Sequence, residues 1–144
     1  PYQAAVLGEH LARTGKSAGV AARAGVYAMQ AYLAAAKLAP PGEGGGALAD
    51  QARAVAVGLF LDRAFPSDPN TDGARLLAGQ ILAQQGKQQE AFDLLARVTP
   101  GYTRAAAARL VQASVGFELI RPGADGKPSA ANKGEIYKRL VADI

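Results

Sequence analysis

The sequence predicts an all-α protein of about six or seven helices that pair as antiparallel hairpins. Alanine, the best helix former and a poor strand former, supplies 33 of the 144 residues. Apolar side chains recur every three or four residues, and no segment alternates with the period of two that marks a strand. Short junctions rich in glycine and proline separate the helical segments. Connections of that length join antiparallel neighbours.

The first hairpin is expected over residues 2–38. Val6, Leu7 and Leu11 follow a helical spacing, Gly15 stops the first helix, and Ser17 can cap the second. Residues 39–46 contain two prolines and four glycines and are predicted to form a loop. A third, extra helix is expected over 47–65.

The second hairpin is expected over residues 73–98. Asn70, Thr71 and Asp72 are capping candidates for its first helix, which Gly86 ends. Thr99-Pro100-Gly101 then turns the chain into a helix over 102–119. Residues 121–131 are predicted to be a loop, and Ile136, Leu140 and Val141 indicate a terminal helix over 132–143.

Two parts of the chain contain the same pattern of residues, separated by a constant number of positions, and we call this the internal self-match. Gly8 corresponds to Gly79 and Gly15 to Gly86 at this constant offset. Its matched elements are Leu7-Gly8, Leu11, Gly15 and Val20 in the first part, and Ala78-Gly79, Leu82, Gly86 and Ala91 in the second. The small residue at the eighth position lets two helices approach, the glycine at the fifteenth makes a tight turn, and a small residue is expected where the helices cross. With this spacing, the segments from Tyr2 to Ala28 and from Ala74 to Pro100 resemble tetratricopeptide repeats.

The length of the chain predicts one domain over 1–144. The resemblance implies that it is built as a fragment of a right-handed superhelix of stacked helical hairpins. The matched parts are far enough apart along the chain to leave room for a complete hairpin between them, yet the sequence shows only the helix at 47–65 there. In the family, the first helix of each hairpin lines a groove through positions 2, 5, 9, 12 and 13 of the repeat. These positions correspond to Tyr2, Ala5, Glu9, Ala12 and Arg13, and to Gly73, Leu76, Gln80, Ala83 and Gln84.

The polar members of this set are the candidate peptide-groove residues: Tyr2, Glu9, Arg13, Gln80 and Gln84. The family's clamp for a terminal carboxylate needs lysine at the fifth position and asparagine at the ninth. This chain has alanine or leucine at the fifth position and glutamate or glutamine at the ninth. The resemblance therefore does not predict that form of peptide capture.

The sequence offers no catalytic, cofactor-binding or metal-binding residue set. It contains no cysteine and one histidine, His10, which argues against thiolate or histidine metal sites. Thr14-Gly15-Lys16-Ser17 matches the end of a phosphate-binding loop, but His10 stands where that motif needs glycine and the preceding segment is helical. Asp62, Asp68 and Asp72 are expected to cap helices and solvate turns.

The charge pattern leaves the partner open. A net charge of +4 is dispersed along the chain, and every long apolar run is too short to span a membrane. Because the first residue is Pro1 and not methionine, the chain is expected to be part of a longer one.

The favoured function is a non-catalytic protein–protein interaction or scaffold module that binds a peptide or partner protein. One alternative is a weak nucleic-acid-binding domain that uses Arg104, Arg109, Arg121, Lys138 and Arg139. The other is an accessory domain of a larger enzyme.

Overall fold

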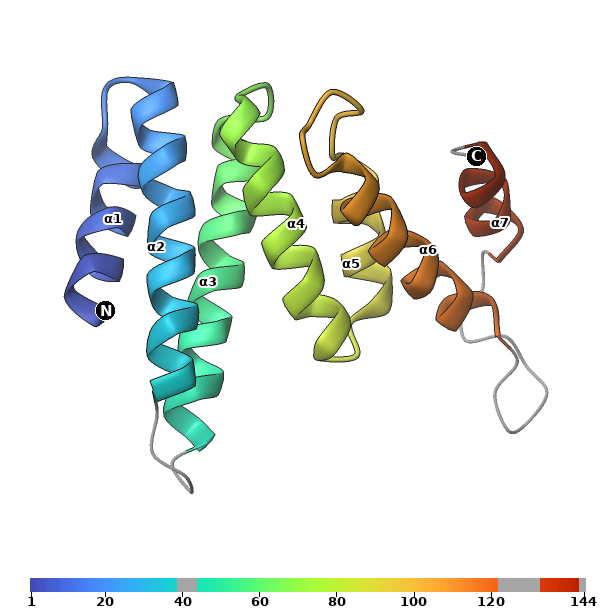
Figure 1. Cartoon of the computed structure of the whole chain (residues 1–144), viewed down its shortest axis with the longest axis horizontal. Coiled ribbons are helices and arrows are strands. Elements are labelled where there is room, and N and C mark those ends of the chain that lie inside the picture. Colours follow the sequence, from blue (N-terminus) through green and yellow to red (C-terminus); the bar gives the residue numbers. More distant parts are fainter. Residues whose placement is uncertain (39–43, 122–132, 143–144) are drawn as a thin grey trace. The chain divides into compact units, whose positions relative to one another are not determined.

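The computed structural model describes residues 1–38, 44–121 and 133–142. In these residues the chain forms seven helices and no strand (Figure 1), which confirms the predicted all-α class. The helices are α1 (Tyr2–Thr14), α2 (Ala18–Leu38), α3 (Gly44–Ala64), α4 (Pro69–Gln84), α5 (Gln88–Leu95), α6 (Ala105–Ile120) and α7 (Lys133–Ala142). The described part of the chain divides into two compact units, Pro1–Ala78 and Gly79–Ile144, with the boundary inside α4.

In the first unit, α1 and α2 form a hairpin joined through small residues. A Cβ built on Gly8 would lie 2.9 Å from the carbonyl oxygen of Ala24 and 3.1 Å from the Cβ of Ala28, so a larger residue would push the helices apart. Gly15 ends α1 with extended backbone, φ −65° and ψ 131°. A Cβ there would lie 2.6 Å from the carbonyl oxygen of Leu11. Glycine is therefore needed at this position because a side chain would not fit, and not because the backbone has a positive φ.

Helix α3 packs against α2 and α4 through a second pair of close approaches. A Cβ on Gly25 of α2 would lie 2.7 Å from a methyl carbon of Leu61. A Cβ on Gly58 of α3 would lie 2.9 Å from the Met29 methyl carbon and 2.8 Å from the Cβ of Ala78. The core of this unit is therefore made of closely spaced backbones as well as large side chains.

Two helices of the first unit begin earlier than the sequence predicts. Helix α3 starts at Gly44, so three of the four glycines expected in a 39–46 loop form its first turn, while 39–43 lie outside the described residues. Each glycine weakens a helix by about 1 kcal/mol without forbidding it. Helix α4 starts at Pro69 instead of residue 73, because proline is well suited to the first helical position, where its missing N–H has no partner to lose.

In the second unit, Gly86 joins α4 to α5 with φ +75°, the left-handed backbone that favours glycine. The Lys87 N–H donates to the Leu82 carbonyl at 2.9 Å, the bond that closes a helix beyond such a glycine. Helix α5 ends at Leu95, because three-residue turns replace the α-helical pattern up to Val98. Similar turns delay the start of α6 from residue 102 to Ala105.

The last helix packs against its neighbours through a glycine and a leucine. A Cβ on Gly116 of α6 would lie 2.9 Å from a Leu140 methyl carbon, and Ile136 of α7 is buried. The described helix runs from Lys133 to Ala142, within the predicted 132–143. The predicted loop at 121–131 lies outside the described residues except for Arg121.

The internal self-match has a structural counterpart in both units. Gly8 meets Ala24, and Gly79 would place a Cβ 2.6 Å from the Cγ of Leu95. The offset that takes Gly8 to Gly79 also takes Ala24 to Leu95, so equivalent positions pack in each unit. The expectation for the twentieth position is half right. Ala91 is buried, whereas Val20 is exposed and does not lie where the helices cross.

Candidate functional site

The candidate functional site is a surface on the first unit where side chains of α1, α2 and α3 meet, and we call it the α1–α3 surface. It contains all three residues that the sequence predicts from this unit: Tyr2, Glu9 and Arg13. Arg53 and Phe60 of α3 also belong to it. Tyr32 of α2 is only 2% exposed and lies beneath this surface, where it contacts Glu9.

Glu9 holds two neighbours in place with its two carboxylate oxygens. Arg13 donates to Oε1 through Nε at 3.0 Å and through Nη2 at 2.9 Å. The Tyr32 hydroxyl donates to Oε2 at 2.8 Å. The guanidinium of Arg13 also lies 4.7 Å from the ring centroid of Phe60, a cation–π distance, so these contacts bridge all three helices.

Arg53 lies over an aromatic pair at the other end of the surface. The rings of Tyr2 and Tyr32 meet edge to face, with centroids 6.1 Å apart. The guanidinium carbon of Arg53 is 5.4 Å from the Tyr2 centroid and 5.9 Å from the Tyr32 centroid, and Nη1 donates a hydrogen bond to the Tyr2 hydroxyl. Among the described residues, no carboxylate lies within ion-pair distance of Arg53.

The electrostatic environment of this surface affects two groups. Burial, and then the hydrogen bond that Tyr32 donates to Glu9, raise the pKa of the Tyr32 phenol to about 12. The hydrogen bond to Tyr2 is the main cause that raises the pKa of Arg53. Arg53 therefore carries a permanent charge on an exposed side chain.

The remaining predicted groove positions divide into packing residues and isolated polar ones. Ala5, Ala12 and Leu76 are buried, so they serve the core and offer no surface to a ligand. Gln80 and Gln84 belong to α4 in the second unit, with Gln80 partly exposed and Gln84 exposed. Within the described residues neither side chain forms a hydrogen bond.

Sequence reasoning misses Tyr32, Arg53 and Phe60. It treats the helix at 47–65 as an extra one and therefore assigns no groove residue to it. A signal for Arg53 and Phe60 does exist in the sequence. If the helix at 47–65 is placed beside the first helix of the chain, its Arg53 and Phe60 become candidates for the same surface as Tyr2.

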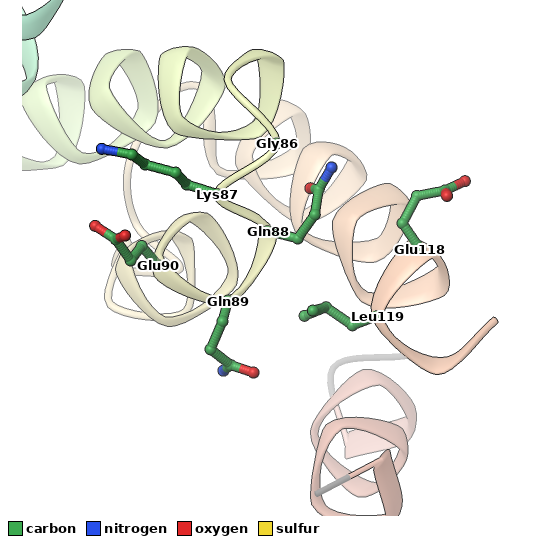
Figure 2. A pocket seen from close by; sticks show the side chains of 7 residues that line it. All are labelled: Gly86, Lys87, Gln88, Gln89, Glu90, Glu118 and Leu119. Atoms are coloured by element: carbon green, nitrogen blue, oxygen red, sulfur yellow. The ribbon is translucent and has the colours of Figure 1, made fainter. Parts of the chain in front are cut away.

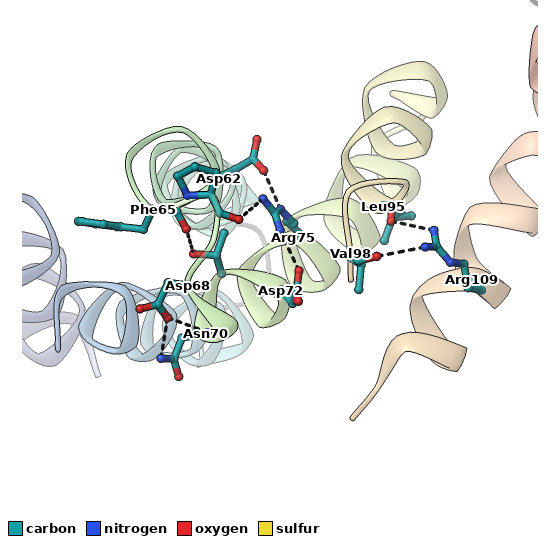
Figure 3. A network of polar contacts seen from close by, with 11 residues as sticks. Asp62, Phe65, Asp68, Asn70, Asp72, Arg75, Leu95, Val98 and Arg109 are labelled. Carbon is teal, nitrogen blue, oxygen red and sulfur yellow. Dashed lines mark hydrogen bonds and ion pairs between the residues drawn. The ribbon is translucent and has the colours of Figure 1, made fainter. Parts of the chain in front are cut away.

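A buried ion cluster in the first unit joins α3 to α4 (Figure 3). Arg75 donates to Asp62 at 2.7 Å, to Asp72 at 2.8 Å and to the Pro66 carbonyl at 2.9 Å. All three charged side chains are at most 6% exposed. Asp62 and Asp72 therefore bind an arginine inside the unit, contrary to the expectation that they cap helices or solvate turns.

Asp68 does cap a helix, as the sequence predicts. Its Oδ1 accepts hydrogen bonds from the backbone N–H of Asn70 at 2.9 Å and from the Asn70 side chain at 2.8 Å (Figure 3). In the described residues, no group of three or more histidine, cysteine or acidic side chains is placed to hold a metal ion.

Several basic residues of the nucleic-acid alternative have partners within the second unit. Arg109 donates to the carbonyl of Val98 at 3.1 Å (Figure 3). It also donates to the side chain of Gln112 at 2.7 Å. Arg139 pairs with Asp93 at 2.9 Å, and Arg121 lies 3.5 Å from Glu118. These side chains are therefore partly committed to contacts inside the protein.

The second unit also contains an open pocket of about 480 Å³ between the α4–α5 turn and the end of α6 (Figure 2). Its lining residues are Gly86, Lys87, Gln88, Gln89, Glu90, Glu118 and Leu119. The Gln88 Oε1 atom is buried and accepts no hydrogen bond from the described residues. The lining mixes both charges and amides, without a histidine, serine or threonine.

No protein-family model matches the sequence, and no match is found among the curated proteins or the solved structures compared with it. Among the described residues, no helix is long and apolar enough to cross a bilayer.

Proposed function

We propose that this chain is a non-catalytic protein–protein interaction module of the tetratricopeptide-repeat type. Its α1–α3 surface would bind a peptide or an extended segment of a partner protein. The repeated close approaches at Gly8 and Gly79 support a repeat architecture, since the same pair of motif positions packs in both units.

The observation that carries the proposal is the exposed guanidinium of Arg53. It is positioned by Tyr2 and Tyr32, and the nearby carboxylate of Asp50 acts on its charge without forming an ion pair with it. A guanidinium held over aromatic rings presents several N–H donors in one plane. It can therefore donate two hydrogen bonds to the two oxygens of a planar carboxylate. The partner segment is therefore expected to supply an aspartate or glutamate at this position.

The rest of the surface supports binding by being already ordered. Both oxygens of Glu9 are occupied by Arg13 and Tyr32, so Glu9 presents little unpaired negative charge to an acidic ligand. Tyr2 is 46% exposed and offers an apolar ring beside Arg53. Preorganised side chains reduce the conformational entropy that binding would otherwise lose.

The test uses fluorescein-labelled peptides in which one acidic residue is placed among alanine and leucine, with glutamine counterparts of identical length. Fluorescence anisotropy measures their affinity for the chain and for Arg53→Gln. Arg63→Gln is the matched control, because Arg63 is an exposed arginine of the same helix without a contact to this surface. We expect acidic peptides to bind more tightly than their counterparts, and Arg53→Gln alone to remove the difference.

Equal affinity for acidic and glutamine peptides would contradict the proposal, as would equal effects of Arg53→Gln and Arg63→Gln. The same assay also measures the affinity of the chain for a labelled single-stranded oligonucleotide. If it binds with an affinity that falls steeply with salt while the peptides do not bind, the nucleic-acid function replaces this one.

A further inference from the structure

The α1–α3 surface contains two places where a guanidinium lies over an aromatic ring. The first is Arg53 over Tyr2. The second is Arg13, whose guanidinium carbon lies 4.7 Å from the ring centroid of Phe60, and we call it the Arg13 stack. An acidic residue bound at Arg53 leaves the Arg13 stack available to another part of the same ligand.

The Arg13 stack differs from Arg53 in its charge. Arg13 donates to Oε1 of Glu9 through Nε at 3.0 Å, and its Nη2 lies 2.9 Å from the same oxygen. This ion pair neutralises the guanidinium. A second carboxylate from a ligand would also lie close to Glu9 and be repelled by it. The Arg13 stack is therefore unsuited to an acidic residue.

The Arg13 guanidinium has one face open to a planar group. Arginine N–H donors lie in the guanidinium plane, so the bonds to Glu9 occupy an edge, while Phe60 lies against one face. The side chain is still 45% exposed, and within the described residues Arg13 makes no further ring or ion contact. Guanidinium groups stack on aromatic faces, so a ligand's ring can lie against the opposite face and leave the guanidinium between two rings.

The separation of the two places favours an extended ligand. Helices α1 and α3 run in the same direction, because Tyr2 meets Arg53 and, further along both helices, Arg13 meets Phe60. At 1.5 Å per residue, the contacts are about 16.5 Å apart along α1 and about 10.5 Å apart along α3. Residues four apart in an extended chain lie on the same side and about 13 Å apart, between these two lengths. Residues four apart on a helix are only about 6 Å apart along its axis and would not reach both places.

We propose that the segment bound by the α1–α3 surface is extended and carries an aromatic residue four positions from its acidic residue. The carboxylate binds Arg53, and the aromatic ring stacks on the open face of Arg13. This inference rests on the proposed function, because it takes the acidic residue at Arg53 as its starting point. Glu9 acts as a specificity-determining residue, since by neutralising Arg13 it makes the second place select a ring over a second acid.

The test measures fluorescence anisotropy with labelled peptides that carry one glutamate in a background of alanine and serine. Four positions from the glutamate, in either direction, stands phenylalanine, leucine or a second glutamate. Two further peptides place the phenylalanine three or seven positions away. In at least one direction, phenylalanine at four positions should bind about threefold to tenfold more tightly than leucine or glutamate there. It should also bind more tightly than phenylalanine at three or seven positions.

Two variants separate the aromatic contact from the acidic one. Arg13→Lys keeps a positive charge beside Glu9 but removes the planar guanidinium, and Phe60→Leu removes the ring against which it lies. Both should lose the preference for phenylalanine and keep the preference for glutamate over glutamine at Arg53. Arg63→Lys is the matched control, because Arg63 is exposed on α3 without a contact to this surface. Circular dichroism checks that each variant keeps its helices.

The outcomes distinguish this inference from the proposed function. If phenylalanine and leucine peptides bind equally while glutamate still increases the affinity, the aromatic contact is wrong and the proposed function stands. Tightest binding with a second glutamate, or with phenylalanine at seven positions as for a helical ligand, would also overturn the inference. Equal effects of Arg13→Lys and Arg63→Lys would do the same. If the glutamate itself adds no affinity over glutamine, the proposed function fails.

Discussion

Arg75 is the charged residue on which the first unit depends most. It is 4% exposed and donates to Asp62, Asp72 and the Pro66 carbonyl. Arg75→Ala would leave two buried carboxylates without this guanidinium and is expected to lower the free energy of unfolding by about 3–5 kcal/mol. Urea unfolding followed by circular dichroism measures the change.

Arg63→Ala is the control for that experiment because its side chain is exposed. A surface substitution of this kind should change stability by less than about 0.5 kcal/mol. Equal stability of the two variants would show that the buried cluster contributes little to holding α3 and α4 together.

Tyr32 gives the α1–α3 surface a pH dependence. Its pKa is raised from 10.0 to about 12, so the folded state holds the phenolic proton more tightly than the unfolded state. The stabilisation is fully present below about pH 10 and is lost as the pH rises towards 12. Tyr32→Phe should lose less stability than the parent chain over this range, while Tyr27→Phe should behave like the parent. Urea unfolding at a series of pH values compares them, and parallel curves for all three would contradict this role.

At the scale of the helix, two glycines of α3 have opposite roles. A Cβ on Gly58 would lie 2.8 Å from the Ala78 Cβ, whereas a Cβ on Gly46 would meet nothing within 4 Å. Gly46→Ala should stabilise the chain by up to about 1 kcal/mol through helix propensity. Gly58→Ala should destabilise it by about 1–3 kcal/mol through overpacking. Melting temperatures of the parent chain and the two variants test this prediction. A shift of the same sign in both variants would contradict the packing described for α3.

The turn between α4 and α5 depends on the backbone angle of Gly86 and not on space. Its φ is +75° and a Cβ would meet nothing within 4 Å. Gly86→Ala should therefore cost about 1–2 kcal/mol for the left-handed backbone. Gly101 has the same open surroundings without a positive φ, so Gly101→Ala should be neutral or slightly stabilising. Indistinguishable unfolding midpoints would show that the turn does not hold its angle.

The sequence predicts the elements well and their ends less well. Helical periodicity and the turn glycines Gly15 and Gly86 locate the helices, because both signals are local. Composition places Gly44 and Pro69 in loops, although glycine is tolerated and proline is favoured in a first helical turn. Leu7 and Val20 have the apolar character of core residues, but the sequence alone does not show that they are exposed.

At the scale of the whole chain, the sequence predicts only part of the site. Position in the repeat identifies Tyr2, Glu9 and Arg13, because these side chains lie on one side of one helix. Arg53 and Phe60 join them from a helix much later along the chain, and such a contact depends on packing between helices that periodicity does not specify. The internal self-match also predicts the close approaches in each unit without predicting which copies of the motif are covered.

A charge exchange between Arg53 and the acidic residue of a bound peptide tests most directly whether Arg53 contacts the ligand. Anisotropy is measured for the parent chain and Arg53→Glu, each with the acidic peptide and with the same peptide carrying lysine in its place. We expect the parent to bind the acidic peptide, Arg53→Glu to lose this binding, and Arg53→Glu to bind the lysine peptide more tightly than the parent does. If Arg53→Glu and the parent show the same preference between the two peptides, Arg53 does not contact the ligand and the proposed function is wrong.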